Sequence, residues 1–500
     1  MILDFGLWTD ELMAEEHPAP GKMRVVVIGG GISGLTAAYQ LTKARAQSGR
    51  APEVLLLEAS DRAGGTVQTI TRDGFLLEAG PDSFISEKPE AWTLAREVGL
   101  EARLIETNEA HRRSFIVRGG RLRPVPEGFQ LLAPTRFWPF VTTDIFSWPG
   151  KARMALDLVL PRRKASANGH DDESLAQFVR RRFGQEALTR MAQPMVGGIY
   201  TADPEHLSLR ATMPRFLDME RQHRSVIRAM WHARRRLGDR HARGTSGARY
   251  SMFLSFDAGV QVLTDALAAA LPPDTIKLNT RVRALSFDAA TRQWRVTTDV
   301  GETTTAAAVC VALPAYAAAE LLRATDAQLA AELDAIPYAS TATVNLAYRR
   351  ADIPHALDGF GFVVPFVERR AVLACTFSSV KFAGRAPAGH TLLRAFVGGA
   401  LQPEMFALAE DQMLAAVRAD LRALLGIEAP PLFAQVAKWP RSMAQYHLGH
   451  LDRVARIEER LQNFPALRLA GNAYHGAGLP DCVRSGRAAA DQLLQAISTH

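Results

Sequence analysis

One short stretch near the N-terminus constrains the fold more than any other. Residues 24–34 read Arg-Val-Val-Val-Ile-Gly-Gly-Gly-Ile-Ser-Gly, and the helix-forming run 35–41 follows. A β-branched strand therefore leads through a glycine-rich turn into a helix. Gly29 permits the turn, Gly31 lets the backbone approach a pyrophosphate, and Gly34 lets the helix pack on the strand. This order predicts the first unit of a dinucleotide-binding domain with a parallel sheet.

An acidic residue closes the predicted second strand. The leucines 55–57 form an apolar run that is followed by Glu58, whose carboxylate can accept both hydroxyls of an adenosine ribose. The helix after the glycine loop presents free N–H groups and a positive dipole end to phosphates. With strand, turn, helix and terminal acid in this order, the sequence predicts an adenine dinucleotide site.

The residues that follow favour FAD over NAD. Asp61-Arg62-Ala63-Gly64-Gly65-Thr66 comes directly after the acid, and a second glycine-containing stretch runs from Gly74 to Ser83. An acid followed by Arg-x-Gly-Gly resembles the signature of the amine oxidase-like flavoproteins. In those proteins the arginine bonds the flavin pyrophosphate, and the paired glycines let the backbone lie against the cofactor. The alternative is two ordinary glycine-rich turns in a large α/β protein.

Composition narrows the class further. A chain of 500 residues with 47% apolar residues can bury a large core in two or three domains. Its three cysteines are isolated, which favours a reducing, cytoplasmic compartment over a disulfide framework or a metal site. Residues 1–22 lack an apolar core, so we expect a disordered extension and not a secretory signal. No apolar run reaches the length of a membrane-spanning helix.

The net charge of +7 raises the question of an anionic partner. No nucleic-acid-binding module accompanies the arginine clusters, so we expect no nucleic acid. Residues 137–164 combine Phe137, Trp138 and Trp148 with several lysines and arginines. Aromatic rings beside cations suit the interface of an anionic bilayer, and the alternative is an ordinary domain-packing helix. Peripheral association with the inner face of the cell membrane is therefore one of two interpretations.

The C-terminal block supplies a family resemblance. Residues 471–486 resemble the C-terminal flavin loop of the oxygen-dependent protoporphyrinogen oxidases, and the likeness covers about Met23 to Leu494. It continues through 194–204, 359–365, 396–399 and 439–450. The resemblance implies an α/β fold, with a Rossmann-like FAD-binding domain of the amine oxidase-like type, a mixed-sheet substrate domain and a helical domain. The expected bounds are 1–22 for the extension, 23–105, 250–312 and 440–500 for the FAD-binding domain, 106–127 and 313–439 for the substrate domain, and 128–249 for the helical domain.

The resemblance also assigns site residues. In the substrate pocket it implies that the Gly198 carbonyl faces the tetrapyrrole and that Val363 and Phe396 sandwich the ring. Residues 471–486 would lay backbone amides against the isoalloxazine, with a helix N-terminus aimed at its edge. The predicted contacts to non-covalent FAD are Gly29, Gly30, Gly31, Ile32, Ser33, Gly34, Glu58, Arg62, Gly65, Thr66, Gly80, Pro81, Asp82, Ser83, Val282, Trp439, Asn472, Ala477, Gly478 and Leu479.

The chain departs from the family pattern at one position that matters for the substrate. The arginine that pairs with a substrate propionate in the protoporphyrinogen enzymes aligns with Ser114, and Arg113 lies just before it. On a strand, an offset of one residue puts the side chain on the opposite face, so Arg113 can serve only if the register shifts. The overall likeness favours protoporphyrinogen IX. The serine favours the related branch that oxidises coproporphyrinogen III, which carries four propionates and often lacks that arginine.

The resemblance implies that the flavin removes hydride from a porphyrinogen until six electrons have left, and that O2 reoxidises the flavin to give H2O2. No residue pattern indicates a separate acid–base, nucleophilic or metal centre, so no side chain is assigned to catalysis and the chemistry belongs to the cofactor. Expected partners are the porphyrinogen, O2 and the next enzyme of haem synthesis, with the chain a monomer or a homodimer. The alternatives are a flavin amine oxidase and a non-enzymatic scaffold of the same fold.

Overall fold

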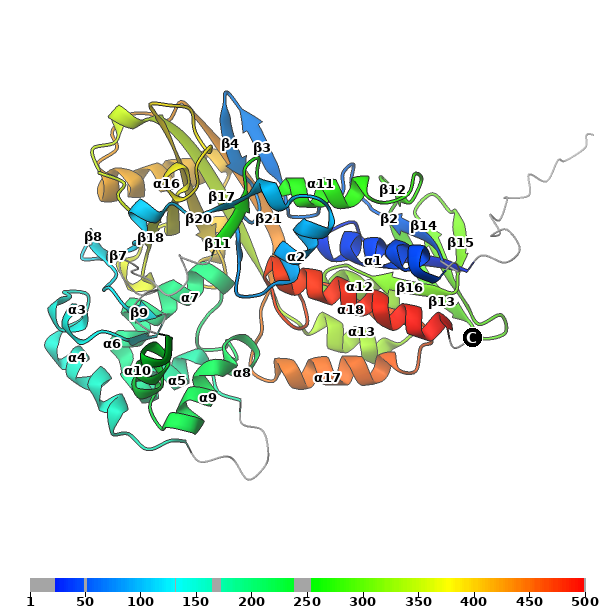
Figure 1. The fold of residues 1–500 in the computed structure, drawn as a ribbon, viewed down its shortest axis with the longest axis horizontal. Coiled ribbons are helices and arrows are strands. Elements are labelled where there is room, and N and C mark those ends of the chain that lie inside the picture. Colours follow the sequence, from blue (N-terminus) through cyan, green and yellow to red (C-terminus); the bar gives the residue numbers. More distant parts are fainter. Residues whose placement is uncertain (1–22, 49–51, 131, 164–171, 238–252, 499–500) are drawn as a thin grey trace, which may run out of the picture.

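The computed structural model describes residues 23–48, 52–130, 132–163, 172–237 and 253–498. The expected extension 1–22 lies outside these residues. Figure 1 shows an elongated molecule, with the parallel sheet and its helices at one end and the larger, mixed sheet and the helical segments at the other. The predicted domain boundaries stay a prediction.

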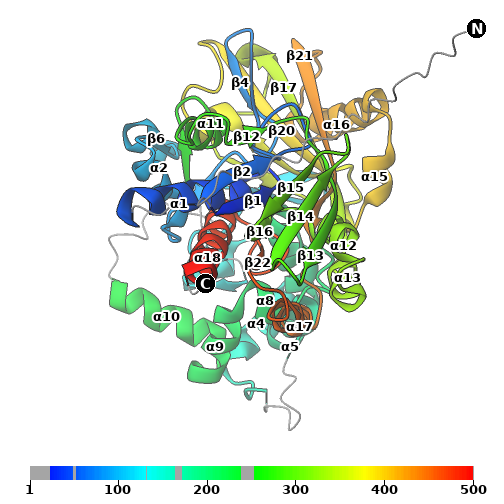
Figure 2. The same ribbon diagram turned by 90° about the vertical axis from the view of Figure 1, so that its right-hand side faces the viewer.

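A five-stranded sheet forms the nucleotide-binding half. Its strand order is β12-β2-β1-β16-β22, and every neighbouring pair is parallel. The β1 strand is buried along its whole length, as its run of valines requires. Helices α1 and α18 pack against one another beside this sheet (Figure 2). The bounds are β1 Arg24–Ile28, α1 Ile32–Ser48, β2 Glu53–Leu57, β12 Ile276–Lys277, β16 Ala308–Val311, β22 Leu467–Leu469 and α18 Leu479–Ser498.

Smaller elements complete this half. Strands β13, β14 and β15 form an antiparallel sheet, β5, β11 and β6 form another, and β3 pairs with β4. The bounds are β3 Thr69–Arg72, β4 Phe75–Glu78, β5 Phe84–Ile85, α2 Glu90–Glu97, β6 Leu104–Glu106, β11 Phe253–Phe256, α11 Gln261–Ala269, β13 Val282–Asp288, β14 Gln293–Thr298, β15 Thr303–Ala306, α12 Ala315–Leu322, α13 Ala327–Asp334 and α17 His450–Leu461.

A seven-stranded sheet forms the core of the second half, in the order β21-β17-β20-β19-β18-β7-β8. One face packs on α16 through a cluster that includes Phe115, Phe362 and Val397. The opposite face, which includes Ile116 and Val363, belongs to the cluster shared with the helical segments. The bounds are β7 Phe115–Arg118, β8 Arg121–Pro124, β17 Tyr338–Arg349, β18 Gly361–Val363, β19 Val372–Phe377, α14 Ser378–Lys381, β20 His390–Gly398, α15 Pro403–Ala407, α16 Glu410–Leu425 and β21 Phe433–Ala444.

The described residues 137–163 and 172–237, within the range expected to be helical, are mainly helical and lie beside the second face of that sheet. A fully buried ion pair between Arg182 and Asp157 joins two of the helical segments. A short two-stranded pair, β9 and β10, precedes them. The bounds are β9 Phe129–Gln130, β10 Ala133–Pro134, α3 Phe137–Thr142, α4 Trp148–Ala155, α5 Leu175–Phe183, α6 Gln185–Ala187, α7 Gln193–Tyr200, α8 Leu209–Thr212, α9 Pro214–His223 and α10 Val226–Leu237.

Two expected element boundaries are wrong. Gly197 to Tyr200, which the glycine pair suggested would interrupt the helix, forms the last turn of α7. Its C-cap, Thr201, is left-handed, so the chain turns there instead. The C-terminal helix begins at Leu479 and not near Cys482, and Pro480 occupies its first turn, where a missing N–H costs nothing.

Candidate functional site

The glycine loop between β1 and α1 leaves room for a ligand at one position. A Cβ added to Gly29 would lie 2.6 Å from the Ala312 oxygen, and one added to Gly34 would lie 1.9 Å from the Gly29 oxygen. These two glycines are therefore required by the protein's own packing. A Cβ added to Gly31 would meet no protein atom within 4 Å. The loop thus has the open backbone surface that a bound pyrophosphate needs.

The predicted ribose acid lies beside this loop. Glu58 Oε2 accepts a hydrogen bond from the Gly30 N–H at 2.6 Å, and Oε1 accepts one from the Ser60 N–H at 2.8 Å. The backbone N–H of Thr280 donates to the Glu58 carbonyl at 2.8 Å. That bond brings the start of β13, where Val282 lies, next to the acid. The adenosine-binding residues predicted from distant parts of the sequence therefore converge.

A second glycine loop covers the first. Gly31 and Gly64 form a parallel bridge, and the Gly64 N–H donates to the Gly30 carbonyl at 2.8 Å. The guanidinium of Arg62, predicted to bond the pyrophosphate, donates to the backbone carbonyls of Ala63, Gly65 and Val67. In this structure it therefore holds the shape of its own loop.

Buried charges fix the third predicted loop, Gly80 to Ser83. Asp82 pairs with Lys381 at 2.9 Å and approaches Arg394 at 3.9 Å. Burial alone would raise the pKa of Asp82, but these cations and the hydrogen bonds from Lys381 and Ser83 hold it far below its usual range. A Cβ added to Gly80 would overlap the Thr66 oxygen, so two predicted cofactor contacts touch there.

Arg394 joins the cofactor loop to the predicted substrate pocket. Its guanidinium donates to the Gly80 carbonyl, and its charge lies 4.7 Å from the ring centroid of Phe396. Trp439 Nε1 donates to the Ala79 carbonyl at 2.8 Å from the same sheet. Arg394 and Lys381 were not predicted as site residues from the sequence. The sequence feature that could have indicated Arg394 is an arginine among the apolar residues 392–397. It lies two positions before Phe396 and thus on the same face of the strand.

The predicted substrate contacts gather on one face of the seven-stranded sheet. Val363 pairs with Ala374, Ala374 with Phe396, and Phe396 with Thr343, so the four form one row across four strands. A Cβ added to the exposed Gly198 of α7 would lie 3.9 Å from Val363 Cγ1. Val363 and Phe396 therefore lie side by side on one face and form one wall, so the sandwich predicted for these two residues is absent from this structure, and Gly198 lies close to Val363. Their contacts with a substrate stay a prediction.

Arg113 does not join that row. Phe115 pairs with Phe362 and Ile116 with Val363, so Ser114 shares the face of Ile116 and Val363. Arg113 lies on the opposite face, where its charge lies 5.5 Å from the Phe115 ring centroid. Its guanidinium pairs with the Asp358 carboxylate, and its Nε donates to the Asp358 carbonyl at 2.6 Å. The structure does not have the register shift that Arg113 would need. The predicted contact between Arg113 and the substrate is therefore wrong for this structure, because Arg113 faces away from the row.

The fold and the site together define a flavoprotein of two halves. The parallel sheet presents a glycine loop and an acid for a dinucleotide, and the mixed seven-stranded sheet presents an apolar row to the same region. Residues 32–494 match the family model of flavin containing amine oxidoreductases, and the chain belongs to that family. It is an FAD-dependent oxidoreductase.

Individual relatives match along nearly the whole chain. The chain is 35% identical to a coproporphyrinogen III oxidase of Bacillus subtilis, over 95% of this chain and 98% of the relative. It is 38% identical to a coproporphyrinogen III oxidase of Propionibacterium freudenreichii, over 98% and 94%. A chloroplastic protoporphyrinogen oxidase of Nicotiana tabacum is 30% identical, over 96% and 87%. The crystal structure of a protein from Exiguobacterium sp. 255-15 superposes with a TM-score of 0.82 at 31% identity, covering 95% of this chain and 99% of that one.

Two expected absences can be examined within the described residues. Among these residues, no group of three or more histidine, cysteine, aspartate or glutamate side chains is arranged to hold a metal ion. No helix within the described part of the chain is long and apolar enough to cross a membrane. The three cysteines are buried, and burial raises the pKa of the Cys310 and Cys482 thiols to about 12.

Proposed function

We propose that this enzyme oxidises coproporphyrinogen III to coproporphyrin III with O2 as the electron acceptor. The observation that carries the choice of substrate is Ser114. It occupies the pocket face of the chain before β7, whereas Arg113 is turned to the other face and paired with Asp358. An enzyme that relies on a bidentate arginine at this position for a propionate would have no such contact here.

The comparisons support coproporphyrinogen over protoporphyrinogen IX, the substrate that the overall likeness favoured in the sequence. Relatives named coproporphyrinogen III oxidase are 35%, 38% and 32% identical to this chain. Relatives named protoporphyrinogen oxidase, such as those of Nicotiana tabacum and Arabidopsis thaliana, are 30% and 27% identical. Both groups support a porphyrinogen as the substrate class.

The chain's own contribution is to bind, orient and exclude water. Bound FAD supplies the hydride acceptor and passes the electrons to O2, so that three two-electron oxidations remove six electrons and six protons and yield three H2O2. The row Val363, Ala374 and Phe396 offers an apolar wall to a macrocycle. Arg394 holds that wall against the Gly80 loop. Such a site acts through positioning and not through a strong general base.

The test compares kcat/KM for the two porphyrinogens in the wild type, in Ser114→Arg and in Arg113→Gln. We expect the wild type to prefer coproporphyrinogen III at least about tenfold. Ser114→Arg should move the ratio toward protoporphyrinogen IX, since a charge-assisted pair is worth about 1.5–3 kcal/mol, or roughly ten- to a hundredfold. Arg113→Gln, the matched loss of charge on the far face, should leave the ratio unchanged. A wild-type preference for protoporphyrinogen IX would refute the proposal.

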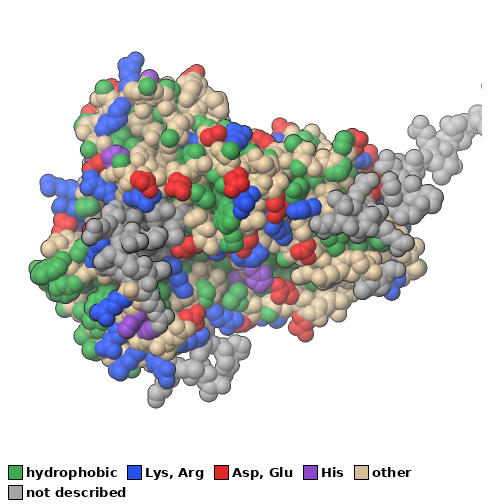
Figure 3. Space-filling view, in the orientation of Figure 1, with side chains coloured by type: hydrophobic (Ala, Val, Ile, Leu, Met, Phe, Trp, Pro, Cys, Tyr) green, Lys and Arg blue, Asp and Glu red, His purple; other side chains and the backbone are tan. Residues whose placement is uncertain are grey.

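We also infer that α3 and α4 contact an anionic bilayer. Phe137, Trp138 and Trp148 are 61%, 71% and 67% exposed, and Lys151 lies 4.4 Å from the Trp148 ring centroid. Figure 3 shows apolar and basic side chains side by side at the end of the molecule where Figure 1 places these helices. A domain-packing helix would bury such rings, so their exposure favours the membrane over the alternative.

Vesicle co-sedimentation tests this inference. Full-length protein should bind vesicles of phosphatidylglycerol more than vesicles of phosphatidylcholine, and Trp138→Ser with Trp148→Ser should reduce that binding. Val300→Ser removes an equally exposed apolar side chain, 72% exposed, from the turn between β14 and β15 and should change nothing. Equal binding by the tryptophan double variant and the wild type would contradict the inference.

A further inference from the structure

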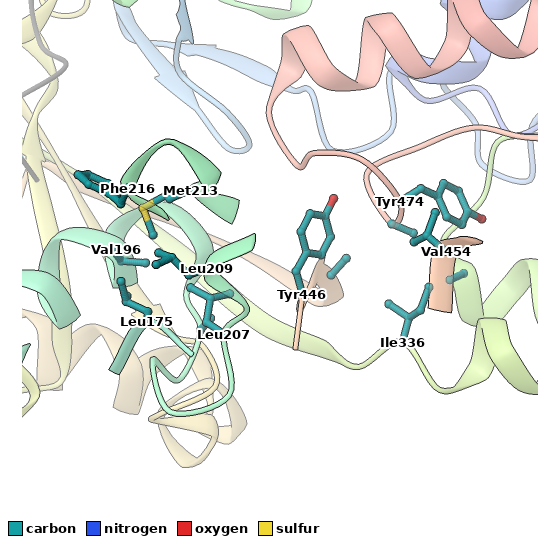
Figure 4. Packing of buried hydrophobic residues seen from close by; sticks show 14 of the residues in the cluster. Leu175, Val196, Leu207, Leu209, Met213, Phe216, Ile336, Tyr446, Val454 and Tyr474 are labelled. Carbon is teal, nitrogen blue, oxygen red and sulfur yellow. The ribbon is translucent and has the colours of Figure 1, made fainter. Parts of the chain in front are cut away.

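Residues 445–450 link β21 to α17, include the first residue of α17, and touch two parts of the site at once. Gln445 and Tyr446 of the link and His450 at the helix start are 3%, 2% and 3% exposed. Buried loop residues need partners for their polar groups. In Figure 4 the Tyr446 side chain lies between Leu207 and Leu209 of the helical segments and Tyr474 of the C-terminal loop. We call residues 445–450 the connecting segment.

On one side, the connecting segment holds the predicted flavin loop. The Tyr446 hydroxyl donates to the Asn472 carbonyl at 2.6 Å and accepts from the Gly476 N–H at 2.9 Å. One side chain thus joins both ends of a five-residue stretch of that loop. His450 Nε2 lies 3.0 Å from the Tyr474 carbonyl in the middle of the stretch, so the ring nitrogen must be the donor. The rings of Tyr446 and His450 stack at 4.1 Å and 10°, which fixes both in place.

On the other side, the connecting segment holds the residues that follow Gly198. The Gln445 amide donates to the Tyr200 carbonyl at 3.1 Å, at the end of α7. The Ser208 N–H donates to the Tyr446 carbonyl at 2.8 Å, and the Leu448 N–H to the His206 carbonyl at 2.9 Å. These bonds attach the connecting segment to the 200–208 stretch by backbone as well as by side chain.

We propose that Tyr446 and His450 are positioning residues that set the flavin loop Asn472–Leu479, and that Gln445 sets α7 and its Gly198 carbonyl against the same loop. The three act through backbone carbonyls and N–H groups and touch neither substrate nor cofactor in this assignment. The connecting segment thereby fixes the distance between the loop that faces the flavin and the helix that faces the substrate. The proposal rests on the flavin contacts predicted for Asn472 and Ala477–Leu479, and not on which porphyrinogen is oxidised.

The experiment separates the two sides of the connecting segment by variant and by readout. Tyr446→Phe keeps the ring and removes both hydrogen bonds to the loop. In purified holoenzyme it should raise the dissociation constant for FAD about ten- to a hundredfold and change the visible flavin spectrum. Gln445→Met, which keeps the side-chain shape, should raise KM for porphyrinogen while the FAD spectrum and dissociation constant stay at wild-type values.

Rescue and control variants distinguish a role in positioning the flavin loop from a general effect on the stability of the fold. His450→Gln retains an N–H donor and should keep FAD affinity near the wild-type value, whereas His450→Leu should lower it. Tyr348→Phe removes the hydroxyl of another buried tyrosine, which packs against α16, and should leave the spectrum and FAD affinity unchanged. The proposal is overturned if Tyr446→Phe keeps the wild-type spectrum and affinity, or if Tyr348→Phe changes them equally. Should Tyr446→Phe fail to fold, the difference between the two His450 variants decides the question in the same way.

Discussion

Substitution of Gly31 by valine should abolish FAD binding without unfolding the protein. A Cβ at Gly31 meets no protein atom within 4 Å, and the residue does not have a positive φ. The valine side chain therefore enters the open space at this loop that is assigned to the pyrophosphate. The apoprotein should keep its free energy of unfolding to within about 0.5 kcal/mol, as surface substitutions usually do.

The loss of affinity follows from the contacts that the valine would block. A phosphate at a helix N-terminus accepts charge-assisted hydrogen bonds from backbone N–H groups, worth about 1.5–3 kcal/mol each. Loss of two such bonds costs roughly 3–6 kcal/mol, or about a hundred- to ten-thousandfold in FAD affinity. The ratio of flavin to protein absorbance in the purified variant measures the occupancy, and thermal unfolding of the apoproteins measures the stability.

Gly34→Ala is the comparison that makes the result interpretable. Its added Cβ would lie 1.9 Å from the Gly29 oxygen, so this variant should destabilise the apoprotein itself by several kcal/mol. Gly31→Val, by contrast, should lose FAD while the apoprotein keeps its free energy of unfolding. Stoichiometric flavin in Gly31→Val would show that the pyrophosphate does not lie on this loop.

Three further outcomes are expected. Glu58→Ala should weaken FAD binding about ten- to a hundredfold in a fluorescence titration, and unchanged binding would remove Glu58 from the site. Phe396→Ala should raise KM, and the inhibition constant of a diphenyl-ether herbicide, by the equivalent of about 1–3 kcal/mol, and unchanged constants would make Phe396 a core residue. Burial lowers the pKa of His450 to about 4, with His475 and Arg453 adding to it and Asp172 opposing. In the unfolded chain this histidine takes up a proton below about pH 6.5, whereas in the folded protein it stays neutral down to about pH 4. The free energy of unfolding therefore falls by about 2 kcal/mol between about pH 7 and about pH 5. Urea unfolding of wild type and His450→Gln measures this, and an equal loss in both would contradict it.

Local patterns made much of the nucleotide-binding half predictable. Three signals depend only on neighbouring residues: the β-branched run in 24–28, the glycine turn, and the acid after leucines 55–57. The strand β1, the helix α1 and the strand β2 formed where these signals predicted them. The glycine pair Gly119-Gly120 likewise predicts a hairpin in residues 114–126, and the pairing of Arg118 with Arg121 confirms it. These signals are reliable because strand periodicity and left-handed glycine turns are decided by neighbouring residues.

The ionic parts of the site could not be predicted in the same way. Asp82 and Lys381 are 299 residues apart in sequence, and their pairing depends on how the two sheets meet. The α7 boundary was wrong for a related reason. Two glycines lower helix propensity, but packing of the buried Gln193–Val196 stretch keeps the helix intact through Tyr200.

The two-residue period of a strand decides which of the residues 113 and 114 faces the predicted substrate contacts. Ser114 and Arg113 differ by one position, so at most one of them can face the pocket. To turn Arg113 inward, β7 would have to slip against β8, with which it pairs along its whole length, and against β18, with which it pairs at Phe115 and Ile116. The slip would take Phe115 and Val117, now 7% and 0% exposed, out of the cluster that packs on α16, would turn Ile116 out of the cluster on the opposite face, and would break the pair with Asp358. A single propionate contact could not offset that cost. The side chain at 114 therefore decides the charge at this part of the pocket, and exchanging serine for arginine there tests substrate choice.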